Sequence, residues 1–397
     1  MDSAVSAGPR NKGVRVRGLR NKPSAGCRFC DGHHNRIDFI QMPESGRTHT
    51  GRPGRFRRRA TGATGGYESG IKATMSAKTS PPIPSGRKAP AEAPPAPRVS
   101  PTDLAVLFSL PLLFAVSWLL PEGLWRRFCR SAGPLAVPML AGDPKRVLGV
   151  MRRTLGGRPL GRSAEAILSE LAGEQVLTIL QLLRDHRPGG WRPEIRLAGL
   201  EHVEAALGRS HGAILWVGFS VYGDLVAKMA FHQARLAVSH LSRASHGFSG
   251  TRFGMRVLNP IQTAVEDRYL GERVLLSPTG ATAALETLAA RLADNRVVTF
   301  TVHRNAKRPV VVPFLEGEIF LAPGAPLLAL KTQAALLPVF AFRDEAGVHT
   351  VTIEAPLEVP RDLPKQDVTQ SVGRQYAARL EPYVLEHPGQ WRGWLHL

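Results

Sequence analysis

Cysteine is scarce in this 397-residue chain, which contains only Cys27, Cys30 and Cys129. A disulfide-stabilised domain needs several paired cysteines within its folded region, so these three imply no disulfide framework and indicate a chain that faces the cytosol. Cys27 and Cys30 are followed by His33 and His34. Structural zinc sites take four ligands, usually from two separated pairs, and no second pair follows. We therefore predict no metal site and no cofactor.

Acidic residues are also few, with 32 Asp and Glu against 52 Lys and Arg, a net charge of +20. Residues 1–100 carry +13 of this excess and are rich in Arg, Gly, Pro and Ser without hydrophobic periodicity. Such a segment cannot bury enough apolar surface to offset its ordering entropy, so we predict a disordered basic leader. The moderately basic remainder suits anionic lipid or an acidic carrier protein. Because no folded basic domain or stacking motif is apparent, we expect no nucleic-acid partner.

The uncharged run Leu104–Leu120 is slightly too short to cross a bilayer. As a helix its length would be about 26 Å against a hydrocarbon core of about 30 Å, and Pro111 would kink it. Basic residues flank both ends, and no small-residue cleavage site follows. We predict a membrane anchor within residues 101–130, either a short span or a helix lying in the interface. The alternative is a buried core helix.

Residues 131–397 are predicted to form one α/β domain around a mostly parallel sheet flanked by helices. Ala213–Val217 is a continuous apolar run, typical of a strand buried on both faces. A glycine-bracketed turn follows, and helical spacing begins at Asp224, which is expected to cap that helix. Val297–Val302 is a second buried strand. The other predicted elements are helices at Ser163–Leu183, Glu201–Leu207, Thr282–Leu292 and Arg374–Leu385, strands at Ile195–Leu197, Arg235–Ser239 and Leu337–Phe342, and an edge strand at Val348–Ile353.

The turn after Val217 and the end of the chain together resemble the late lauroyl and myristoyl acyltransferases of lipid A synthesis. That family places a Gly-His-x-Gly-Asn-Trp-Glu turn between a buried strand and a helix, and here the turn is Gly218-Phe219-Ser220-Val221-Tyr222-Gly223-Asp224. The last residues, EHPGQWRGWLH, resemble the terminal signature of the family. The resemblance covers about residues 195–397, with a weaker match over 104–194.

The resemblance implies a membrane-associated enzyme on the cytoplasmic face of the inner membrane. Such an enzyme moves a fatty acyl chain from acyl carrier protein or acyl-CoA to a hydroxyl of a lipid or glycolipid. The family's general base is the turn histidine, but Phe219 occupies that position here, and Asp224 occupies the position of the acid that orients the base. A second departure comes at the end of the strand Val297–Val302, where the family has an acidic residue followed by an amide and this sequence has Val302-His303-Arg304-Asn305.

Phenylalanine cannot accept a proton, so another route must activate the acceptor hydroxyl. We predict that His303 acts as a relocated base with Asp224, and that Phe219, Ser220, Arg243 and Arg304 contact substrate. The arginines offer bidentate donors to phosphate or carboxylate groups. Ser220 as a nucleophile, or slow transfer without a base, are alternative routes. The alternative function is a catalytically inactive homologue that acts as a lipid-binding or regulatory module.

Overall fold

The computed structural model describes residues 97–158, 161–277, 280–302 and 308–397. The predicted leader lies outside the described residues except for its last four positions. The strands are β1 (Ile195–Ala198), β2 (Ala213–Val217), β3 (Val238–Arg243), β4 (Glu272–Leu276), β5 (Val297–Thr301), β6 (Val310–Phe314), β7 (Gly317–Leu321), β8 (Ala335–Arg343) and β9 (His349–Ile353). The helices are α1 (Pro101–Leu119), α2 (Glu122–Ala141), α3 (Pro144–Leu155), α4 (Ala164–Asp185), α5 (Leu200–Leu207), α6 (Val226–Gln233), α7 (Asn259–Glu266), α8 (Thr282–Ala293), α9 (Gly324–Thr332) and α10 (Lys365–Glu386).

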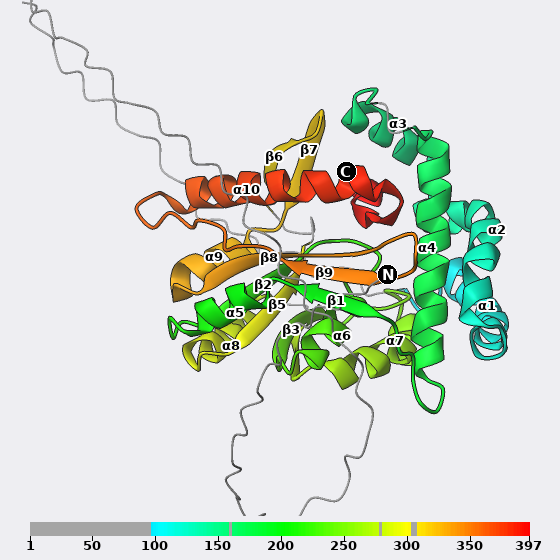
Figure 1. Ribbon diagram of the computed structural model, residues 1–397, viewed down its shortest axis with the longest axis horizontal. Helices are drawn as coiled ribbons and strands as arrows, with labels where there is room; N and C mark the ends of the chain where they lie inside the picture. Colours follow the sequence, from blue (N-terminus) through cyan, green and yellow to red (C-terminus); the bar gives the residue numbers. More distant parts are fainter. Residues whose placement is uncertain (1–96, 159–160, 278–279, 303–307) are drawn as a thin grey trace, which may run out of the picture. The chain divides into compact units, whose positions relative to one another are not determined.

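The predicted α/β fold with a mostly parallel sheet is confirmed. Seven strands form the sheet in the order β1-β9-β8-β2-β5-β3-β4, and the five from β8 to β4 run parallel. All five residues of β2 are buried because this strand is in the middle of the sheet. Helix α10 extends along one side of the sheet and α6 along the other (Figure 1). The carboxyl ends of β2, β3 and β5 therefore meet at one edge, where ligands bind in open α/β sheets.

Helix α1 confirms the helix predicted for Leu104–Leu120 and packs against α4, which lies between α1 and the sheet (Figure 1). Its first turn is closed by a capping box between Ser100 and Asp103. The Asp103 carboxylate also accepts a hydrogen bond from Thr251 at 2.8 Å. Ser117 donates to the Leu180 carbonyl of α4 at 2.8 Å. These contacts fix α1 to the α/β domain while its opposite face remains exposed.

Two boundaries differ from the sequence prediction. Helix α6 begins at Val226, and its cap residue is Leu225, which makes no side-chain hydrogen bond to the helix. The prediction that Asp224 caps α6 is therefore wrong, because the Asp224 carboxylate is paired with Arg392 instead. Strand β3 begins at Val238 rather than at Arg235, since Arg235 has a φ of 58° and belongs to the turn before the strand.

The predicted edge strand is also misplaced. β9 pairs antiparallel with β8 on one side and parallel with β1 on the other, so it lies inside the sheet. Its alternating pattern reflects alternate burial of its residues rather than an open edge. β1 takes the edge position, and its own register with β9 runs from Ile195 opposite His349 to Ala198 opposite Thr352.

Candidate active site

The turn between β2 and α6 is held in place by backbone hydrogen bonds to two distant segments. The Gly218 amide donates to the Val339 carbonyl of β8 at 2.7 Å, and the Arg392 amide donates to the Phe219 carbonyl at 3.0 Å. The Ser220 hydroxyl is buried and donates to the Ala341 carbonyl of β8 at 2.6 Å. The turn is therefore clamped between β8 and the end of the chain.

Phe219, at the position of the histidine in the family it resembles, contacts Arg392 and His396. The Arg392 guanidinium lies 4.6 Å from the centre of the Phe219 ring, a cation–π contact. The His396 ring lies 4.9 Å from Phe219, centre to centre. Arg392 also donates to an Asp224 carboxylate oxygen at 3.0 Å. Arg392 thus connects the two residues that occupy the positions of the family's base and acid.

The environment of Asp224 favours its charged form. Burial alone would raise the pKa of Asp224, but electrostatic interactions with His246, Lys228 and Arg392 outweigh burial and hold the pKa below its usual value. The carboxylate is therefore ionised at neutral pH and is paired with Arg392.

A fully buried carboxylate, Glu266, lies among the charged groups next to Asp224. It is fully buried and accepts hydrogen bonds from Lys228 at 2.7 Å, His246 at 2.9 Å and Arg273 at 3.0 Å. Burial would raise the pKa of Glu266, but Lys228 and His246 hold it well below its usual range. The Glu266 charge is thus fully paired inside the fold, as a buried ion requires.

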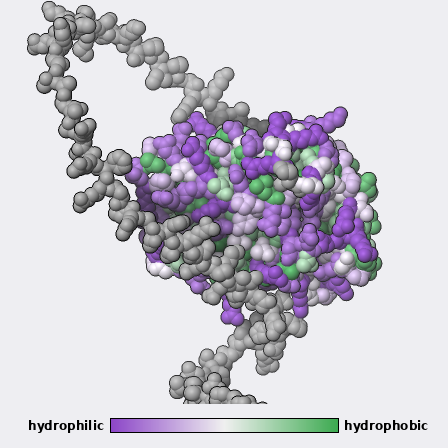
Figure 2. All heavy atoms as spheres, turned by 45° about the horizontal axis from the view of Figure 1, so that its top comes forward, coloured by the Kyte–Doolittle hydropathy of each residue, from purple (hydrophilic) through white to green (hydrophobic). Residues whose placement is uncertain are grey.

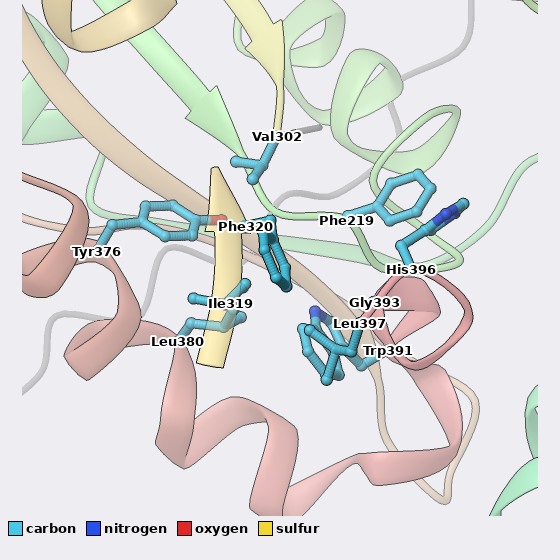
Figure 3. A pocket seen from close by; sticks show the side chains of 10 residues that line it. All are labelled: Phe219, Val302, Ile319, Phe320, Tyr376, Leu380, Trp391, Gly393, His396 and Leu397. Atoms are coloured by element: carbon cyan, nitrogen blue, oxygen red, sulfur yellow. The ribbon is translucent and has the colours of Figure 1, made fainter. Parts of the chain in front are cut away.

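An apolar pocket lies beside the turn, at the carboxyl ends of β2 and β5 (Figure 3). It has a volume of about 40 Å³, which is room for a few water molecules. Figure 3 shows Phe320 of β7 in the middle of the pocket and the Trp391 indole nitrogen turned toward it. The lining residues are Phe219, Val302, Ile319, Phe320, Tyr376, Leu380, Trp391, Gly393, His396 and Leu397.

Tyr376 of α10 brings a polar group to this apolar pocket. Its side chain is fully buried, and its hydroxyl has no hydrogen-bond partner among the residues that the structure describes. Figure 3 shows the hydroxyl pointing toward the interior of the pocket. Burial raises the pKa of Tyr376, so the hydroxyl keeps its proton and remains a hydrogen-bond donor.

Comparison with known proteins identifies the family. The sequence model of one family, described as bacterial lipid A biosynthesis acyltransferase, matches residues 113–397. The chain belongs to this family. The predicted family is thus confirmed, and the activity that its description names is acyl transfer in lipid A biosynthesis. Among curated proteins, none matches the chain.

The acyltransferase fold brings together some of the predicted site residues. Phe219 lines the pocket, and Asp224 is joined to it through Arg392. Ser220 lies beneath the turn with its hydroxyl hydrogen-bonded. Arg243 is the half-buried last residue of β3 and is not one of the described residues that line the pocket. His303 and Arg304 lie outside the described residues.

Four residues at this site were not predicted from the sequence. Arg392 and His396 belong to the terminal segment that resembles the family signature, so this motif was the signal for them. Tyr376 occupies an ordinary core position of a helix, and nothing in its sequence context reveals that its hydroxyl lacks a partner. His246 lies in the basic loop after β3, where sequence alone does not separate it from its neighbours.

Proposed function

We propose that this protein is a membrane-associated acyltransferase that uses a thioester of acyl carrier protein or coenzyme A as donor. The acceptor is a hydroxyl of a lipid or glycolipid on the cytoplasmic face of the inner membrane. The observation that carries the proposal is the apolar pocket beside Phe219, at the family's catalytic position in a chain of that family. An apolar pocket with few polar groups suits a fatty acyl chain.

The pocket needs to widen before it can hold an acyl chain. Its volume of about 40 Å³ accommodates only a few methylene groups. Phe320 is partly exposed on the β6–β7 hairpin and lies in the middle of the pocket (Figure 3). We therefore infer that Phe320 moves aside when the chain enters.

The outer face of α1 and α2 supports membrane association. Phe108 is 78% exposed, and Leu119 and Leu135 are each 83% exposed. Figure 2 shows hydrophobic side chains at the right-hand edge of the surface, on the side where Figure 1 places these helices. Arg127 and Arg130 of α2 are exposed near this surface and suit anionic headgroups.

Two helices are long and apolar enough to cross a membrane, judged by length and composition alone within the described residues. Helix α4 is 56% buried in its apolar window and serves as a core helix, whereas α1 is only 22% buried. Because α1 is fixed to α4 along one side, we propose that its exposed side lies in the membrane interface.

Transfer requires that the acceptor oxygen bonds to the thioester carbonyl carbon while the carbon–sulfur bond breaks. The hydroxyl proton passes to a base and then to the departing thiolate. We propose His303 as this base, from its place after the strand Val297–Val302. His396 is a second candidate, because its ring lies beside Phe219 and lines the pocket.

The alternative function is a lipid-binding or regulatory module that has lost catalysis. The observation that favours it is the Asp224–Arg392 pair: the acid that would orient a base is paired with a cation, and the base position holds an aromatic ring. This module would bind the same acyl chains without transferring them.

A transfer assay with a labelled acyl thioester and vesicles of bacterial inner-membrane lipid, run beside a binding assay for the same thioester, separates these functions. We expect the parent to transfer the acyl group. We expect one of the variants H303A and H396A to lose transfer while it still binds the thioester. Saturable binding without transfer supports the module. A parent that neither binds nor transfers contradicts both functions.

A further inference from the structure

The Tyr376 hydroxyl is a buried polar group whose position is fixed by the surrounding rings. The Tyr376 ring packs 4.4 Å from that of Trp216 and 5.7 Å from that of Phe340, centre to centre. A methyl group built on Gly218 would lie 3.3 Å from the hydroxyl oxygen. The hydroxyl therefore lies at the start of the turn that carries Phe219 and has little freedom to find another partner.

A buried hydroxyl without a partner lowers stability, and native proteins rarely keep one without a reason. Tyr383, on the same helix, shows the usual solution, since its hydroxyl is hydrogen-bonded to Glu354 at 2.5 Å. Tyr376 differs in that its hydroxyl points into a pocket, so a ligand atom can supply the missing partner (Figure 3).

We propose that the Tyr376 hydroxyl donates a hydrogen bond to the carbonyl oxygen of an acyl group bound in the pocket. The assignment rests on the proposed function, because it takes the acyl thioester as ligand. A thioester carbonyl only accepts hydrogen bonds, and the protonated phenol is a donor. The surroundings are apolar, so this bond is stronger than it would be in water. It would place the reacting carbon next to the turn that carries Phe219.

Tyr376→Phe tests this role, because it removes the hydroxyl and keeps the ring. The probe is dodecanoyl-CoA labelled with ¹³C at its carbonyl, added to the full-length protein without an acceptor. We expect Y376F to bind it about threefold to tenfold more weakly than the parent does. We also expect the infrared carbonyl band of the bound ligand to shift to higher frequency in Y376F. Binding of dodecane, which has no carbonyl, should be equal in both proteins.

Tyr383→Phe is the matched control. It removes a hydroxyl that already has a partner, so we expect a lower Tm with unchanged dodecanoyl-CoA binding. Y376F should instead keep or raise the Tm, because no hydrogen bond among the described residues is lost. Equal binding and an unchanged carbonyl band in Y376F overturn the role of Tyr376 alone. Failure of the parent to bind dodecanoyl-CoA overturns this inference together with the proposed function.

Discussion

Two regions next to the turn after β2 differ in how their polar groups are partnered. On what we call the paired side, the half-buried Asp224 and the buried Glu266 carboxylates have cationic partners. On the unpaired side, the buried Tyr376 hydroxyl beside the pocket has no partner among the described residues. Both sides place polar groups in an apolar interior, at a cost in solvation. The paired side recovers that cost within the protein. On the unpaired side no described residue offsets it, and in the proposal above a ligand does, which separates the binding site from the structural framework.

The largest expected effect comes from breaking the paired side at Glu266. Glu266→Ala leaves Lys228, which is only 3% exposed, without its counter-ion. We expect a loss of about 3–5 kcal/mol in the free energy of unfolding, measured by chemical denaturation. Asp267→Ala is the matched control: Asp267 is 50% exposed, and its ion pair with Arg273 should contribute less than about 1 kcal/mol. Equal losses in the two variants would show that the buried cluster has no special role.

The second-largest effect is expected from variants that convert the site toward the family pattern. Phe219→His supplies an imidazole, but Arg392 still holds the Asp224 carboxylate. We therefore expect the double variant F219H/R392M, in which Asp224 is released, to transfer acyl groups about 100-fold faster than F219H alone. The measurement is the initial rate of transfer from a labelled acyl thioester to vesicle lipid. A double variant no faster than F219H would mean that Arg392 does not restrain Asp224.

The central strands could be predicted because their apolar character is continuous. Ala213–Val217 was predicted with the bounds that β2 has, and β5 ends one residue before the predicted Val302. The range predicted for β3 was wrong because the buried residues of this strand include polar ones. His240 is buried with a hydrogen bond to Thr299 at 2.7 Å, which no hydrophobic pattern reveals.

The site could be predicted only in part, for a related reason. The resemblance located Phe219 and Asp224 in the sequence, but their relation depends on Arg392, which lies 168 positions after Asp224. A long-range ion pair leaves no periodic signal along the chain. Tyr376 has the spacing of a core residue, and only the three-dimensional arrangement separates it from Tyr383, whose hydroxyl is satisfied.

His349 extends the comparison, because one of its two ring nitrogens has no partner among the described residues and it is not one of the residues that line the pocket beside Phe219. It is buried, and its Nδ1 atom has no partner within the described parts of the chain. Burial, together with the charge of Arg343, lowers the pKa of His349 to about 3. Below pH 6.5 this histidine binds a proton in the unfolded chain but not in the folded protein. The free energy of unfolding therefore falls as the pH drops toward the pKa of His349 in the folded protein.

His349→Phe removes this proton linkage and keeps an aromatic ring beside Trp191 and Tyr222. Between pH 6.5 and pH 5 we expect the parent to lose about 2 kcal/mol of unfolding free energy that H349F retains. Urea denaturation at several pH values measures the difference. His211→Gln, at an exposed position, controls for the loss of a histidine as such. Parallel pH profiles for H349F and the parent would disprove the linkage.

A substitution at Ser220 is expected to have the smallest effect. It separates a structural role of the hydroxyl from a role as nucleophile. Its hydroxyl donates to the Ala341 carbonyl at 2.6 Å and is buried, which is the geometry of a group that fixes the turn rather than of a nucleophile. Ser220→Ala should therefore lower the free energy of unfolding by about 1 kcal/mol and leave the rate of acyl transfer unchanged. If S220A instead abolished transfer while keeping its stability, the serine would have to leave Ala341 during the reaction. The paired side of the turn would then include a catalytic residue, and Ser220 would belong to the ligand site rather than to the structural framework.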